Sequence, residues 1–190
     1  RNTLIGGFAG DVLTTGYYNS TLGYASLSAD TQGATATAIG YAALLNQNFT
    51  TATVNYNVAM GYNAASSLTV GLNNVIIGGL AGDSLTDADR NVAVGTSALS
   101  TDTLGSRSTA LGYGTLAAQN MTTATQTYNT AVGYGAGIAV TTGTKNTLIG
   151  GFSGDALQTG AFNVSLGYNS LGLDTDGTRS VAIGNDTLAT

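Results

Sequence analysis

The sequence predicts an all-β protein built as a parallel β-roll, a β-solenoid of eleven stacked coils. Three observations favour this fold: one five-residue motif recurs eleven times, its copies are evenly spaced, and β-branched and apolar residues alternate with period two. The motif reads Asn-Val-Ala-Val-Gly at 91–95, and every copy ends in glycine. The copies begin at Asn2, Asn19, Ala36, Asn57, Asn74, Asn91, Ser108, Asn129, Asn146, Asn163 and Ser180.

We call the residues from one motif to the next a rung. Complete rungs are 17 residues long except the third and the seventh, which have 21, so four rungs form a 72-residue super-repeat. Segment 2–11 accordingly returns, with conservative exchanges, at 74–83 and 146–155. Fixed-period self-similarity is typical of a one-dimensional stack, so we expect residues 1–190 to form a single repetitive domain. Because the chain begins and ends inside repeats, we interpret it as part of a longer fibre.

Each rung is predicted to hold two short strands separated by two turns. The motif is the first strand, in which the middle residue, Ala in six copies, faces away from the two residues that flank it. We expect one face to point into the coil and the small Ala face to be covered by another backbone. The second strand follows the motif glycine and carries Tyr in six copies and Leu in six. At about 4.8 Å per rung, the stack would span roughly 50 Å.

The two longer rungs carry four extra residues each, within the matching segments 48–53 and 120–125. Insertions in repeat arrays map to loops on one face, often the binding face. We therefore expect Phe49 and Met121 at the loop tips, as contacts with a neighbouring chain or as exposed binding elements.

The position just before each motif forms a column that holds all five basic residues of the chain. Long amphipathic side chains there can stack on one another along the outside of the roll. The column is either a ladder that binds sugars or anionic surface groups, or a solvated edge that prevents strand mispairing. The binding interpretation selects Tyr18, Tyr56, Arg90, Arg107, Tyr128, Phe162 and Arg179 as candidate site residues.

Composition argues against several functions. The formal net charge is −5, whereas nucleic-acid binding needs clustered Lys and Arg. Cys, His and Glu are absent, so thiolate metal sites and disulfides are unavailable, and we expect neither metal nor cofactor. No apolar run approaches the roughly 20 residues of a membrane helix, so we expect no membrane insertion by this segment.

Catalysis would have to rely on Asp alone. Asp87, Asp89 and Asp102, on adjacent rungs, are the only carboxylates close enough in the repeat to act together, and turn roles explain them more simply. We therefore expect no enzyme. A column of Thr residues suggests an ice-binding surface, but its neighbouring column is mixed, and hydrogen-bonded Thr ladders are ordinary in sheets.

Residues 179–184, Arg-Ser-Val-Ala-Ile-Gly, resemble the Asn-Ser-Val-Ala-Ile-Gly motif of the trimeric autotransporter adhesin head, the YadA-like left-handed parallel β-roll. Residues 129–134, Asn-Thr-Ala-Val-Gly-Tyr, are similar to a repeat of phage tail fibres and large bacterial surface proteins. The resemblance implies a homotrimer whose rolls pack around a common axis, an extracellular location, and attachment to a host cell-surface glycan or protein. Rungs of 17 and 21 residues are longer than the adhesin-head repeat, so bacterial and phage origins both stay open. A polysaccharide-depolymerising spike and an ice-binding solenoid are the alternatives.

Overall fold

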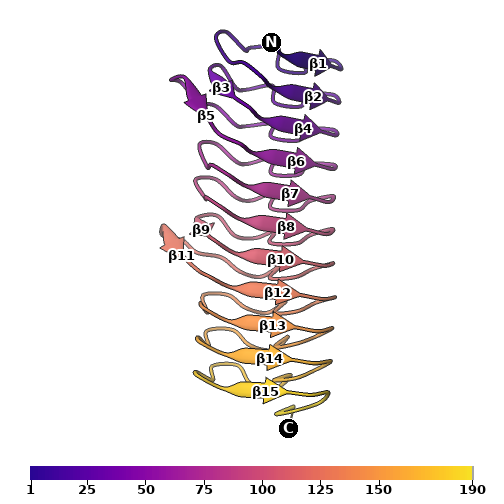
Figure 1. Ribbon diagram of the computed structural model, residues 1–190, viewed down its shortest axis with the longest axis vertical. Helices are drawn as coiled ribbons and strands as arrows, with labels where there is room; N and C mark the ends of the chain where they lie inside the picture. The colour runs from indigo at the N-terminus through magenta and orange to yellow at the C-terminus, as the bar shows by residue number, and fades with distance from the viewer. Residues whose placement is uncertain (190) are drawn as a thin grey trace.

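The computed structural model describes residues 1–189, and these form one straight stack of eleven rungs with the termini at opposite ends (Figure 1). Each motif is one strand of an eleven-stranded parallel sheet in which Ala93, for example, lies directly beside Ala110. The strands are β1 (Thr3–Ile5), β2 (Ser20–Leu22), β4 (Thr37–Ile39), β6 (Val58–Met60), β7 (Val75–Ile77), β8 (Val92–Val94), β10 (Thr109–Leu111), β12 (Thr130–Val132), β13 (Thr147–Ile149), β14 (Val164–Leu166) and β15 (Val181–Ile183). The predicted β-solenoid of eleven rungs is confirmed, and the described residues contain no helix that could cross a membrane.

The prediction of two strands in every rung was wrong. Within residues 1–189, additional strands occur only where each longer rung lies beside the rung before it, and there they form two-stranded parallel sheets on the side of the stack away from the main sheet (Figure 1). The first pairs β3 (Gly33–Ala34) with β5 (Thr53–Val54), and the second pairs β9 (Gly105–Ser106) with β11 (Thr125–Gln126). These strands precede the next motif, and in every rung the segment after the motif glycine, where the second strand was predicted, is a run of turns.

This turn segment has an alternating backbone in every rung. The sixth and eighth residues after the first motif residue both adopt positive φ, as at Ala25 and Leu27 (53° each). Such alternation is incompatible with an extended strand. The rungs are still joined by hydrogen bonds there, since the amide of Leu27 donates to the carbonyl of Ala43 at 3.0 Å. The periodic sequence therefore encodes a hydrogen-bonded ladder, but not a second β-sheet.

The main sheet is oriented opposite to the predicted orientation. The middle residue of each strand after β1 points into the coil and is buried, with Ala93 0% exposed, whereas both flanking residues are partly or fully exposed. The Ala face needs no second chain to cover it, because the opposite wall of the same rung covers it with large side chains such as Leu99. A narrow interior is filled by pairing small with large residues, which explains the recurring Ala.

A ladder of buried asparagines links adjacent rungs by hydrogen bonds at the start of the strands. The amide of Asn91 donates to Oδ1 of Asn74 at 2.9 Å, and Nδ2 of Asn91 donates to the carbonyl of Gly105, also at 2.9 Å. The same two bonds recur at Asn19, Asn74, Asn146 and Asn163. They satisfy backbone groups that would otherwise be buried without partners.

The motif glycine is required by its conformation and by close packing. Gly95 has φ of 134°, and a Cβ added to it would lie 2.4 Å from the carbonyl oxygen of Gly112 on the next rung. Any side chain at this corner would separate adjacent rungs, so all eleven motifs end in glycine.

Candidate functional site

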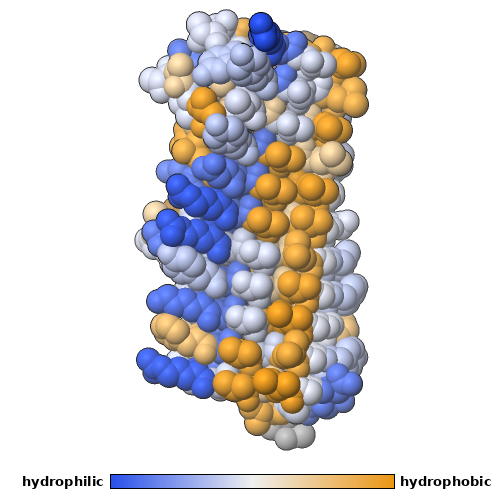
Figure 2. All heavy atoms as spheres, in the orientation of Figure 1, coloured by the Kyte–Doolittle hydropathy of each residue, from blue (hydrophilic) through white to orange (hydrophobic). Residues whose placement is uncertain are grey.

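The column before the motif lies on the outside of the stack. From Tyr18 to Arg179 its residues all have positive φ, between 52° and 68°, which turns the chain sharply into the strand. Figure 2 shows hydrophilic side chains projecting in a stripe beside the apolar stripe of the main sheet. The predicted binding residues Tyr18, Tyr56, Tyr128 and Phe162 are exposed there, as are Arg90 and Arg179.

The structure brings some of these candidates together and keeps others apart. The guanidinium carbon of Arg107 lies 5.5 Å from the ring centre of Tyr128. Farther along, Nζ of Lys145 lies 4.7 Å and the guanidinium carbon of Arg179 5.4 Å from the ring of Phe162. The column therefore consists of separate small clusters, not one continuous binding ladder.

A groove of about 250 Å³ opens beside the second insertion, between the column and the short β9–β11 sheet. We call it the charged groove. Its lining consists of Asp87, Asp89, Arg90, Ser106, Arg107 and residues 124–126. The groove therefore combines two predicted site residues, Arg90 and Arg107, with two of the carboxylates considered above.

Hydrogen bonds hold one wall of the charged groove in place. Nη1 of Arg107 donates to the hydroxyl of Tyr128 at 2.8 Å, and that hydroxyl donates to Oε1 of Gln126 at 2.6 Å. The guanidinium is thus fixed by a chain of two bonds that begins on β11.

The facing wall is fixed through Asp89. Its Oδ1 accepts from the amide of Leu72 at 2.8 Å, its own amide donates to Oγ of Ser106 at 2.9 Å, and its Oδ2 lies 3.5 Å from Nη1 of Arg90. By contrast, the carboxylate of Asp87 is exposed and has neither a hydrogen bond nor an ion pair within residues 1–189. Asp87 is therefore free to bind a ligand.

Phe49 and Met121 are not at exposed loop tips, contrary to the prediction. They are only 6% and 5% exposed. Their backbone amides donate to Oδ1 of the buried Asp30 and Asp102, at 3.1 and 2.9 Å, and this turns both side chains inward. They form part of the core and are not candidate binding residues.

Each of these aspartates belongs to a buried polar network. Oδ2 of Asp102 accepts a hydrogen bond from Nε2 of Gln119, whose Oε1 accepts from Nδ2 of Asn129 at 2.8 Å. The first insertion repeats the arrangement with Asp30, Gln47 and Asn57. Because Asp102 is 0% exposed inside the coil, it does not line the charged groove with Asp87 and Asp89.

Sequence reasoning missed an exposed aromatic ladder at the glycine corner. The rings of Tyr24, Tyr41 and Tyr62 stack with centres 5.6 and 5.4 Å apart, and Tyr113 stacks on Tyr134 at 5.2 Å. Tyrosine in six of eleven rungs at one position was the available signal, but it was interpreted as part of a second strand. Because each stacked ring covers its neighbour's face, the ladder presents ring edges and hydroxyls to solvent.

Sequence reasoning also did not identify the outer face of the main sheet as a candidate contact surface. It appears as a continuous apolar stripe along the stack in Figure 2. The residue before the motif glycine is apolar in all eleven strands. The residue after the first motif position is Val, Thr or Ser. None of these outward side chains is charged.

The threonine column uses its hydroxyls within the stack. Oγ1 of Thr69 donates to the carbonyl of Thr86 at 3.1 Å, and Oγ1 of Thr86 donates to the carbonyl of Thr103 at 3.0 Å. The hydroxyl protons therefore serve rung-to-rung bonding instead of ordering external water.

Two aspartates at the same place in successive super-repeats have altered acidity. Burial raises the pKa of Asp83 and Asp155 above the ordinary value of 3.8, although backbone hydrogen bonds to both carboxylates act in the opposite direction. In each residue Oδ1 is shielded from solvent and meets no donor within residues 1–189. Desolvation therefore disfavours the charged form.

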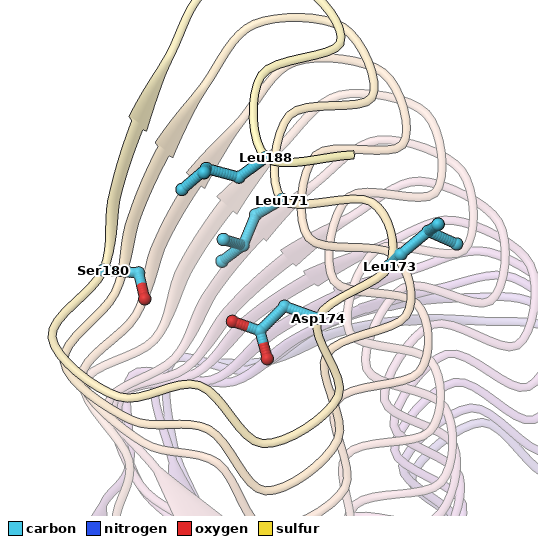
Figure 3. A pocket seen from close by; sticks show the side chains of 5 residues that line it. All are labelled: Leu171, Leu173, Asp174, Ser180 and Leu188. Carbon is cyan, nitrogen blue, oxygen red and sulfur yellow. The ribbon is translucent and has the colours of Figure 1, made fainter. Parts of the chain in front are cut away.

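A second cavity, of about 370 Å³, lies at the last rungs (Figure 3). Leu171 and Leu188 point into it from the column that fills the coil, Asp174 and Ser180 face it, and Leu173 points away. Leu171 continues the core of the preceding rungs, whereas Leu188 is 56% exposed, so we assign this cavity to the open end of the coil.

Comparison of the chain with protein-family profiles, curated proteins and solved structures finds no match. In residues 1–189 no group of three or more acidic, His or Cys side chains is arranged to hold a metal ion. Two surfaces stand out as candidates for function: the uncharged outer face of the sheet and the charged groove.

Proposed function

We propose that the chain is a non-enzymatic segment of an extracellular fibre that serves attachment to a cell surface, as part of a bacterial adhesin or a phage tail fibre. We further propose that it assembles as a homotrimer through the outer face of its main sheet. The observation that carries the proposal is this uncharged, apolar face, which runs the full length of the stack (Figure 2).

The size of the face supports burial against other chains. Eleven strands about 4.8 Å apart and three residues wide make a surface of about 50 Å by 10 Å, on the order of 500 Å². The largest apolar patch of a typical monomer is roughly 300–600 Å² and is often functional. A standard interface takes roughly 800 Å² from each partner, so assembly through this face would also bury residues at the adjoining corners.

A second copy of the chain fits this face better than an unrelated partner. Every copy has the same rung spacing, so side chains on one sheet can interdigitate with those on another over the whole length of the stack. Without charged groups on the face, no ion would be desolvated or opposed by a like charge on close approach. The number three comes from the resemblance to the trimeric adhesin head.

Rigidity suits the proposed role. Consecutive rungs are joined by backbone bonds, by the asparagine ladder and by stacked tyrosines, so a long stack resists bending. Such a rod can project an attachment surface away from a cell or virion.

The test is the solution mass measured by light scattering coupled to size exclusion. We expect three times the chain mass of 18.9 kDa. Ile77→Glu places a charge at the middle of the outer face and should yield monomers, since burying an unpaired charge costs several kcal/mol. Thr142→Glu, at an exposed turn, is the matched control and should remain trimeric.

Circular dichroism should show that both variants keep their β-structure. A monomeric wild-type protein, or a trimer that persists in folded Ile77→Glu, would contradict assembly through this face.

A further inference from the structure

We propose that the charged groove binds one uncharged pyranose unit of a cell-surface polysaccharide. This inference rests on the proposed attachment function and specifies its ligand class. It is carried by the groove's mixed lining, its fixed geometry and a comparison with the equivalent place in the first super-repeat.

The lining has the chemistry that recognises sugar hydroxyls. Each hydroxyl both donates and accepts hydrogen bonds, and the groove offers acceptors on Asp87 and donors on Arg90 and Arg107. Ser106, Thr125 and Gln126 add neutral groups that can do both. Two carboxylates and two guanidinium groups balance, so the groove favours an uncharged polar ligand over an acidic or a basic one.

Two of the polar groups, Arg107 and Asp89, already make hydrogen bonds within the protein. Arg107 is fixed by Tyr128 and Gln126, and Asp89 by the Leu72 amide and Ser106. Fixed side chains lose little conformational freedom on binding, which favours recognition of a small ligand. The exposed Asp87 carboxylate, which has no partner within residues 1–189, can accept a hydrogen bond from a ligand without breaking one inside the protein.

The volume of the groove suits a single sugar ring. About 250 Å³ is below the range of roughly 300–1,000 Å³ for sites that enclose drug-sized molecules. A single pyranose in a longer glycan matches this size, with the adjoining units left in solvent.

The repeat itself provides a comparison. The first insertion has the same paired strands, yet the positions 72 residues earlier carry none of the four charges. Thr15, Tyr17, Tyr18 and Thr35 stand there in place of Asp87, Asp89, Arg90 and Arg107, and Val54 replaces Gln126. The fold therefore does not require the charged set, because its first copy forms without it.

The test uses the full chain, labelled with ¹⁵N, and follows its amide signals by NMR during titration with the methyl glycosides of glucose, galactose and mannose at millimolar concentration. At least one should shift the amides of Ser106, Arg107 and Gln126 and leave those of Ala34, Thr35 and Val54 unchanged. Glucuronate and glucosamine are the charged comparison probes and should bind more weakly.

Asp87→Asn is the informative variant because no hydrogen bond within residues 1–189 depends on that carboxylate. Its affinity should fall about tenfold, as expected for loss of one charge-assisted hydrogen bond. The control is Thr15→Asn, which introduces asparagine at the equivalent position of the first super-repeat. It should leave the affinity for the glycoside unchanged. Arg107→Gln should weaken binding to a similar extent.

The proposal fails if no neutral glycoside shifts the groove amides, if glucuronate or glucosamine binds more tightly, or if Asp87→Asn binds as the wild type does. Failure here is distinguishable from failure of the assembly proposal, since the solution mass of each variant is measured separately.

Discussion

At the scale of single residues, the rungs depend on backbone conformations that side chains normally avoid. Within residues 1–189, 26 non-glycine residues have positive φ, and two such positions recur in every turn segment. For an L-residue the left-handed conformation is unfavourable by roughly 1–2 kcal/mol. Hydrogen bonds to the adjacent rung offset this cost, as the Leu27 bond to Ala43 illustrates. At the first of the two positions the chain already uses glycine in two rungs, at Gly114 and Gly135.

Glycine should therefore stabilise one alanine position and destabilise another in the same rung. Ala25 has φ of 53°, whereas Ala29 does not have positive φ, and both are half-buried. Ala25→Gly should raise the free energy of unfolding by up to about 1 kcal/mol, and Ala29→Gly should lower it by roughly 0.5–1 kcal/mol. Urea denaturation of the two variants measures both. Equal destabilisation would show that backbone strain does not matter at Ala25.

The raised pKa values of Asp83 and Asp155 lead us to expect that the stability of the fold depends on pH. Because burial raises their folded-state pKa above 3.8, the folded protein retains protons that the unfolded chain has released, and stability falls as pH rises from 3.8 through the raised values. Replacing both with Asn should therefore raise the melting temperature at neutral pH, with the advantage disappearing below 3.8. Thermal melts of both proteins across this range test the sign. A variant less stable than wild type at neutral pH would refute it.

At the scale of elements, the two insertions are held by buried aspartates. Oδ1 of Asp102 accepts from the amides of Gly105 and Met121, and its Oδ2 accepts from Gln119. The same core column is occupied by leucine in neighbouring rungs, at Leu68 and Leu85. A polar network thus replaces apolar packing where the chain must accommodate four more residues.

Asp102→Ala should destabilise the fold by about 3–5 kcal/mol, because it leaves buried donors unsatisfied. The double variant Asp102→Leu/Gln119→Leu should recover part of this loss, since leucine suits the column and both polar partners are removed together. Asp87→Asn, on the surface, is the control and should stay within about 0.5 kcal/mol. Urea denaturation provides all three values, and a near-neutral Asp102→Ala would show that the network does not hold the insertion.

At the scale of the whole molecule, stability accumulates along one axis. Each rung contacts only its neighbours, so the stack gains one similar interface for every 17 or 21 residues. The same periodicity aligns outward-facing residues into long surfaces: the apolar sheet face, the tyrosine ladder and the column before the motif. The charged groove interrupts this regularity with a local chemistry of its own. The assembly proposal and the ligand proposal therefore concern different features of one architecture.

The sequence by itself determined the β-solenoid, the number of rungs and their register. These follow because equivalent residues of successive repeats must lie beside one another in a parallel stack. A fixed repeat length therefore permits only one alignment of adjacent rungs, in which Asn91 lies beside Ser108 and Gly95 beside Gly112. The stacking of Arg107 on Tyr128 also follows from position in the repeat.

Only the tertiary structure decided which face of the sheet is inside. Alternation assigns residues to two faces, but both faces are apolar here, so hydrophobicity cannot tell Ala93 from Val92 or Val94. The width of the coil determines which face points inward. Inward-pointing leucines such as Leu99 leave room for only a small side chain opposite them, so the alanine face is inside. The inward turn of Phe49 and Met121 likewise depends on buried carboxylates from the preceding rung, a contact between residues 19 positions apart that local pattern does not reveal.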